Sequence, residues 1–81
     1  MKKKYLRDEA NITKFGARLR ELRLLKGYSQ EDLANECDLP LSQIGRTERG
    51  LINTSISHVF LIAKTLKVHP QELFDFNVTT D

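Results

Sequence analysis

Apolar residues near the start of the chain recur at steps of three and four residues, the spacing that places them on one face of an α-helix. This stripe predicts a helix over residues 12–26, with Asn11 as its N-cap and Gly27 as its stop. The apolar positions are Ile12, Phe15, Leu19, Leu22 and Leu25.

Two shorter helices are predicted next. Ser29 is the expected N-cap of the first, which ends near Cys37 and carries acidic residues in its first turn, where the helix dipole favours them. Pro40 suits the beginning of the second, because the first turn of a helix needs no N–H from that residue. Gly50 is expected to end this helix after Arg49.

The remaining pattern predicts two more helices. Ser55 is the expected cap of a helix over residues 56–67, and His69-Pro70 opens a short helix that runs to Phe74. The stripe of the longer helix is expected to face the core, with Ile62 at its edge. Its members are Ile56, Val59, Phe60, Ala63 and Leu66.

Five short helices with tight turns, and no alternating pattern typical of strands, predict a compact all-α fold. Residues 29–37 and 40–49 are joined by a turn of about three residues, which is the helix-turn-helix arrangement. In that motif the second helix enters the major groove of double-stranded DNA. Residues 12–76 would form this domain, between a basic arm over 1–11 and a frayed tail over 77–81.

The helix over 40–49 has the chemistry to read base edges. With Ile44 directed inward, Ser42 and Arg46 point outward and Gln43 lies at the flank. Arginine binds guanine and glutamine binds adenine through paired hydrogen bonds. We therefore predict that Ser42, Gln43 and Arg46 contact bases. Leu41 either touches a thymine methyl group or packs inward.

Two charged residues fall on inward-facing stripes. Arg23 lies four residues after Leu19, and Glu48 lies four residues after Ile44. An unpaired charge on a buried face is costly to desolvate. We expect Arg23 and Glu48 to pair and to join the first helix to the third.

The charge is unevenly distributed along the sequence. Residues 1–26 hold nine basic and three acidic residues, a net +6, whereas residues 27–81 hold four and eight, a net −4. A positively charged N-terminal part, next to a mildly negative remainder, suits a protein that binds a polyanion through one side. The single cysteine allows no internal disulfide, and no apolar run could span a bilayer, so we expect a cytoplasmic protein without membrane association.

Enzyme chemistry has little support in the sequence. His58, His69 and Cys37 are not spaced like metal ligands, and each has a structural explanation as a first-turn residue, a cap or a small core residue. We expect no catalytic residue, no metal and no cofactor.

Residues 15–75 resemble the Cro, phage-repressor or XRE-type helix-turn-helix domain. The similar stretches are FGARLRELRLLKGYSQEDLA, DLPLSQIGRTERG and SISHVFLIAKTLKVHPQELF. The resemblance implies a five-helix lambda-repressor-like fold and a transcriptional regulator. Repression is the default expectation, because a small dimer bound at a promoter blocks polymerase without further parts. It also implies a buried ion pair at Arg23 and Glu48.

The resemblance further implies roles for residues on the DNA side. Pro40 departs from the family pattern, which has serine or threonine at that N-cap, and Gly45 leaves one base-facing position without a side chain. Gln30 would also brace the recognition helix. Base-reading positions would be Leu41, Ser42, Gln43, Gly45 and Arg46, and phosphate contacts would come from Ser29, Gln30, Arg49 and Asn53.

Assembly and partners follow from the same resemblance. A homodimer built from Leu61, Phe74 and Phe76 would bind an inverted-repeat operator, since a two-fold axis requires matching half-sites. Three alternatives remain for the role: an antitoxin that binds a toxin, a module that binds another protein such as polymerase, and a controller of a restriction–modification operon. A neighbouring toxin gene, or neighbouring nuclease and methylase genes, would distinguish them.

Overall fold

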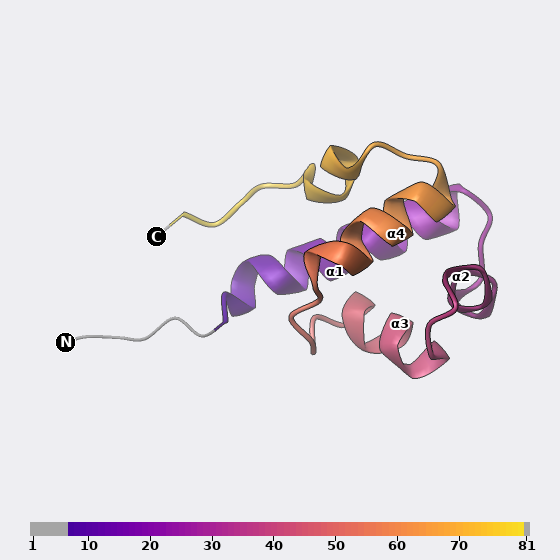
Figure 1. The fold of residues 1–81 in the computed structure, drawn as a ribbon. Coiled ribbons are helices and arrows are strands. Elements are labelled where there is room, and N and C mark those ends of the chain that lie inside the picture. The colour runs from indigo at the N-terminus through magenta and orange to yellow at the C-terminus, as the bar shows by residue number, and fades with distance from the viewer. Residues whose placement is uncertain (1–6, 81) are drawn as a thin grey trace.

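The computed structural model describes residues 7–80, which form four α-helices and one 3-10 helix (Figure 1). Helix α1 contacts α3 and η1, α2 contacts α3 and α4, and α4 contacts η1, so the elements close around one core. None of the helices in this range is long and apolar enough to cross a membrane. The elements are α1 (Glu9–Leu25), α2 (Gln30–Cys37), α3 (Leu41–Glu48), α4 (Ile56–Leu66) and η1 (Pro70–Phe74).

The core takes side chains from all five elements. Burial of apolar surface is the main favourable term in folding, at about 25 cal/mol per Å². The expected stripe of α1 supplies Leu19 and Leu22, which are almost fully buried. The other large side chains with less than 2% exposure are Leu33, Ile44, Ile62, Leu66 and Leu73.

The helix ends lie close to the positions that the sequence predicts. The Ser29 hydroxyl accepts a hydrogen bond from the Asp32 backbone N–H, and the Asp32 carboxylate accepts one from the Ser29 N–H, which makes a capping box at 2.9 and 3.0 Å. The bond from the Ser29 backbone lowers the pKa of Asp32. Gly27 and Gly50 follow α1 and α3 with φ of +81° and +74°, a conformation that favours glycine.

The beginning of α1 differs from the prediction. The helix starts at Glu9 rather than residue 12, and its N-cap is Asp8, whose Oδ1 accepts from the Asn11 backbone N–H at 3.1 Å. The carboxylate is favoured there because it is an anion at the positive end of the helix dipole. The side-chain bond from Asn11 further lowers the pKa of Asp8. Helix α1 thus begins within the range expected for the basic arm, residues 1–11, and Lys2 to Lys4 lie outside the described residues.

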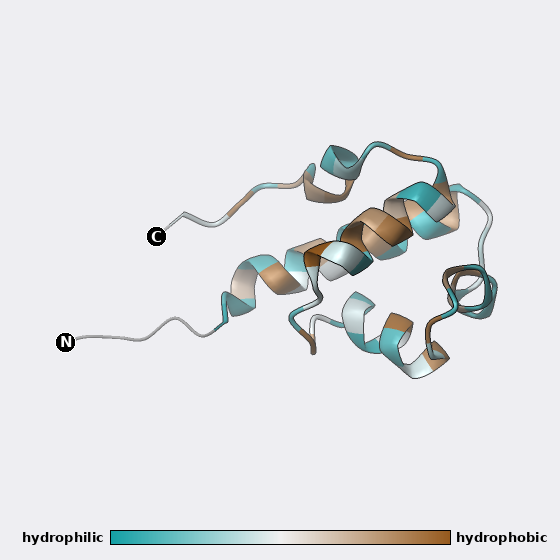
Figure 2. Ribbon diagram, viewed as in Figure 1, coloured by the Kyte–Doolittle hydropathy of each residue, from teal (hydrophilic) through white to brown (hydrophobic). Residues whose placement is uncertain are grey.

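The inward face of α4 also differs from the expected stripe. Ile56 and Phe60 are 72% and 55% exposed, whereas Ile62, expected at the edge, is 1% exposed. Apolar residues surround much of this helix (Figure 2). Its rotation is set by contacts with α2 and η1 rather than by its own pattern. The buried positions are Val59, Ile62, Ala63 and Leu66.

The C-terminal segment lies against α1 instead of fraying. The Asn11 side chain donates to the Thr79 carbonyl and accepts from the Thr79 N–H, both at 2.8 Å. Lys14 Nζ donates to the Asn77 carbonyl and to the Thr79 hydroxyl, also at 2.8 Å. These bonds satisfy backbone groups that an isolated tail would expose to water. The contacts of Asn77 and Thr79 with α1 are not the arrangement that the expected frayed tail implies.

Candidate nucleic-acid interface

A tight turn sets α3 against α2. Asp38 ends α2 in the left-handed conformation, with φ of +56°, and the Leu39 N–H donates to the Ala34 carbonyl at 2.9 Å. Leu39 is half-buried against the core, which anchors the turn. Pro40 is the N-cap of α3 and makes no side-chain cap. The free N–H groups in the first turn of α3 therefore remain available to a negatively charged ligand.

The orientation of α3 separates an inner face from an outer one. Ile44 and Thr47 are 1% and 2% exposed, while Ser42 and Arg46 are exposed to solvent. Leu41 is 47% exposed, so it does not pack into the core. Of the two alternatives for Leu41, packing into the core is excluded, and contact with a thymine methyl group stays a prediction.

Beneath this surface lies a buried polar cluster. The Arg23 guanidinium donates to both carboxylate oxygens of Glu48, at 2.5 and 3.1 Å, as their helical positions predict. Arg23 also donates to the Tyr28 carbonyl at 2.8 Å, and Gln30 Nε2 donates to Glu48 Oε1 at 3.0 Å. The donors around Glu48 balance its buried charge. Through these bonds α1 and α2 both hold the C-terminal turn of α3.

Gly45 lies under other side chains rather than on open surface. A Cβ at this position would meet Arg49 Nη1 at 3.2 Å and Gln30 Oε1 at 3.7 Å. The contact with Gln30 would be an ordinary van der Waals distance, and only the end of the Arg49 side chain would be close. Gly45 is buried, and its base-reading role stays a prediction.

Gln43 is half-buried and has a partner on α4. Its amide nitrogen lies 2.9 Å from Nδ1 of His58, in the first turn of that helix. The sequence placed Gln43 at the flank of α3 but assigned His58 no role at the DNA surface. No spacing signal connects the two positions, because the contact depends on how α4 packs beside α3.

The loop after α3 is tied to the N-terminal segment by Arg7. The guanidinium of Arg7 donates to the Leu51 carbonyl at 3.3 Å and to the Gly50 carbonyl at 3.2 Å, and it pairs with Glu9. The sequence placed residue 7 in the expected basic arm over residues 1–11, and it gave no signal for this contact. The residue following this loop, Asn53, is exposed, as is Arg49 at the end of α3.

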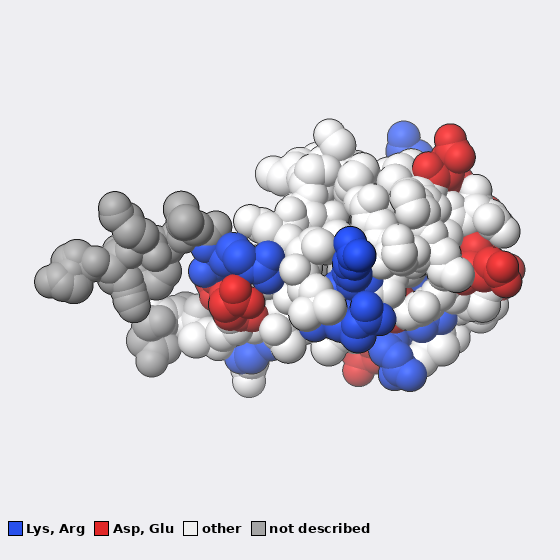
Figure 3. All heavy atoms as spheres, turned by 90° about the horizontal axis from the view of Figure 1, so that it is seen from below, with Lys and Arg blue, Asp and Glu red and all other residues white. Residues whose placement is uncertain are grey.

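The residues expected to contact phosphate differ in whether their side chains already have a hydrogen-bond partner within the domain. Arg49 and Asn53 are exposed, whereas the Ser29 hydroxyl is engaged in capping α2 and the Gln30 amide is engaged with Glu48. Seen from the side on which α3 lies, basic side chains gather near the middle and acidic ones lie mostly towards the margins (Figure 3). This face suits a polyanion. Residues 7–80 contain no cluster of His, Cys, Asp and Glu that could hold a metal ion.

Two helices joined by a tight turn, with an exposed polar and cationic face on the second, define a helix-turn-helix DNA-binding domain. The chain belongs to the helix-turn-helix family, whose model matches residues 19–73. It is accordingly a sequence-specific DNA-binding transcription regulator of the XRE type and not an enzyme.

Several individual proteins that are similar to this chain are restriction–modification control proteins. The chain is 46% identical over 63 residues to Control protein C.BamHI of Bacillus amyloliquefaciens, covering 76% of this chain and 78% of that protein. It is 48% identical to the restriction-modification controller protein C.AhdI from Aeromonas hydrophila, with a TM-score of 0.78 over 80% of this chain and 98% of that one. The C.Esp1396I controller, solved as a tetramer with its natural 35 base-pair operator, is 32% identical, with a TM-score of 0.75 over 84% and 90%.

Proposed function

We propose that this protein controls transcription in a restriction–modification system by binding an operator sequence. The similarity to C.AhdI across 98% of that controller carries the proposal, and the similarity to C.BamHI supports it. These relatives favour the controller role, given above as an alternative, over a stand-alone repressor. The protein would act in the cytoplasm, where the bacterial promoters lie.

Helix α3 would enter the major groove with its outer face against the bases. Arg46 is exposed on that face and presents a guanidinium suited to guanine O6 and N7. Ser42 and Leu41 are exposed nearer the beginning of the helix, where recognition helices contact base edges. Gln43 would approach from the flank. Arg49, Asn53 and the N–H groups at the start of α2, beside Ser29 and Gln30, would position the domain on phosphates.

Replacing Arg46 with alanine is expected to weaken binding to the preferred operator by about 10- to 100-fold and to relax base preference at one position in each half-site. Selection of bound duplexes from a randomised pool, followed by sequencing, measures both effects. Arg20→Ala is the matched control, because it removes the same charge from an exposed site on α1. It should retain the wild-type base preferences. Failure of the wild type to enrich any sequence would contradict the proposed function.

The operator complex would contain a homodimer that uses the exposed apolar part of α4 and η1. Among the side chains expected at the interface, Phe74 is 50% exposed, while Leu61 and Phe76 are partly buried against the core. Ile56 and Phe60 project from one face of α4, four residues apart, and enlarge the surface. Exposed apolar patches of this kind mark protein interfaces.

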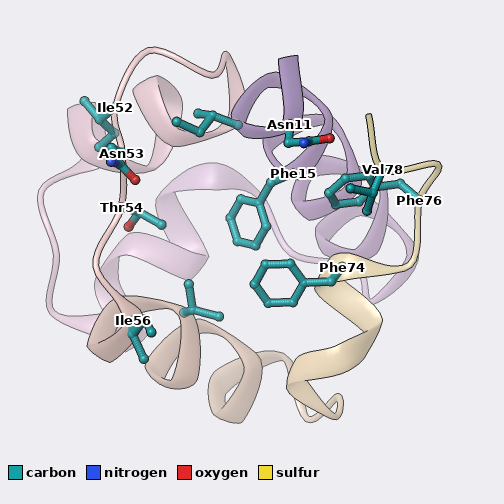
Figure 4. Close-up of a pocket in the computed structure, with 11 residues that line it drawn as sticks. Asn11, Phe15, Ile52, Asn53, Thr54, Ile56, Phe74, Phe76 and Val78 are labelled. Atoms are coloured by element: carbon teal, nitrogen blue, oxygen red, sulfur yellow. The ribbon is translucent and has the colours of Figure 1, made fainter. Parts of the chain in front are cut away.

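A groove beside this surface would add to the dimer contact. It has a volume of about 380 Å³, and Phe15 and Phe74 face each other inside it, with ring centroids 5.2 Å apart (Figure 4). Ile56 borders it from α4, and Val78 from the C-terminal segment. Closing an apolar groove against a second copy would remove its lining from water, which favours association.

Replacing Phe60 with glutamate is expected to raise the dissociation constant of the dimer by at least about 100-fold, because a two-fold axis would bury a charge in each copy of the interface. Analytical ultracentrifugation over a concentration series measures this change. Leu25→Glu places the same charge at a leucine that is 77% exposed near the end of α1, and it should leave the dimer intact. Equal dissociation in both variants would place the interface elsewhere.

A further inference from the structure

A hydrogen bond between α3 and α4 joins a base-facing side chain to a residue that has no expected contact with DNA. Gln43 Nε2 lies 2.9 Å from His58 Nδ1. An amide nitrogen only donates, so Nδ1 is the acceptor in this contact. His58 is itself held in place, since its backbone N–H donates to the Ser55 hydroxyl at 3.1 Å. Both side chains are half-buried, which limits the positions that they can take.

This bond decides which atoms Gln43 offers to a base. The bond to His58 uses one of the two amide hydrogens. The carbonyl oxygen and the second N–H remain available to a base. An acceptor beside a donor matches N6 and N7 of adenine. With the amide reversed, its oxygen would face the ring and only N–H groups would be left, which match the acceptors N7 and O6 of guanine. The two orientations therefore predict different bases.

We propose that His58 is a positioning residue that makes Gln43 select adenine. This inference rests on the proposed operator binding and adds a determinant of its specificity. His58 acts without touching DNA, by accepting the amide hydrogen that would otherwise be free to turn towards the groove. Without this acceptor the amide rotates about its terminal bond, and either orientation becomes available to the base.

The experiment compares wild type, Gln43→Ala, His58→Ala, His58→Asn and His69→Ala by selection from a randomised duplex pool. Gln43→Ala identifies the base pair that Gln43 reads. At that pair, His58→Ala is expected to reduce the preference for adenine over guanine by about tenfold, while leaving the preference set by Arg46 unchanged. His58→Asn should restore much of the preference, because its side-chain oxygen can accept from the Gln43 amide. His69→Ala removes the other histidine, which caps η1, and should retain the preference.

The outcomes separate this inference from the proposed function. A uniform loss of binding to all duplexes with His58→Ala, accompanied by lower thermal stability and unchanged adenine preference, would show a purely structural role and overturn the inference. The inference also fails if Gln43→Ala relaxes no position while Arg46→Ala relaxes one, and operator binding would then still stand. Absence of any enrichment by the wild type would overturn both.

Discussion

Replacing Glu48 with alanine is expected to lower the free energy of unfolding by about 3–5 kcal/mol, the usual cost of removing one partner from a buried ion pair. Arg23, only 5% exposed, would be left without its counter-charge. The Gln30 amide would lose its acceptor as well. Because small domains have a total stability of about 5–15 kcal/mol, urea unfolding followed by circular dichroism should show a large shift of the midpoint.

Two control variants separate charge burial from other effects. Glu21→Ala breaks the pair that Glu21 forms with Arg18 at 2.9 Å, but the Glu21 side chain is 70% exposed, so a change below about 1 kcal/mol is expected. Replacing both Arg23 and Glu48 with methionine should recover much of the lost stability, since apolar groups of similar volume often substitute for a buried pair. A loss in Glu48→Ala no larger than that in Glu21→Ala would refute the role assigned to the pair.

Replacing Gly16 with alanine is expected to destabilise the domain by about 3 kcal/mol or more, at or above the upper end of the usual range for overpacking. A Cβ at Gly16 would lie 2.6 Å from the Glu48 carbonyl oxygen, and the Thr47 carbonyl oxygen would be closer still. These are backbone atoms at the end of α3, so a side chain cannot rotate away to relieve the contact. Helix α3 would have to move away from α1. Thermal and urea unfolding measure the loss.

Gly45→Ala is the matched comparison for this variant. Both glycines are buried inside helices, and alanine gains about 0.5–1 kcal/mol of helix stability over glycine. At Gly45 the nearest atom is the end of the Arg49 side chain at 3.2 Å, which can move. Gly45→Ala should therefore fold with nearly unchanged or slightly higher stability. If Gly16→Ala were equally harmless, the close approach of α1 to α3 would not limit this position.

The sequence predicted the fold class and family, and the structure and comparisons confirm both. Local chemistry was sufficient for α2 and α3, because Ser29 and Gly50 act on the backbone next to them. The pairing of Arg23 with Glu48 could be predicted as well, since each charge lies on a clear apolar stripe. The start of α1 was less predictable, because Asp8 and Asn11 are both good caps and hydrogen-bond to each other.

The sequence predicted which side chains of α3 face outward, but it did not predict all the contacts that the residues of this helix make. Periodicity along α3 placed Arg46 and Ser42 outward, and both are exposed. It could not place Gly45 beside Gln30, because the Gln30 side chain approaches from α2. The same limit applies to the contact between Gln43 and His58.

By itself, the sequence determined where most helices end, that two of them form a helix-turn-helix, and that the charges on α1 and α3 must meet. These features depend on interactions within a few residues or on the cost of burying a charge. Only the tertiary structure decided the rotation of α4, which leaves Phe60 in solvent, and the docking of Thr79 on Asn11. An apolar pattern on several faces of a helix has no preferred direction, so neighbouring elements must select one by packing.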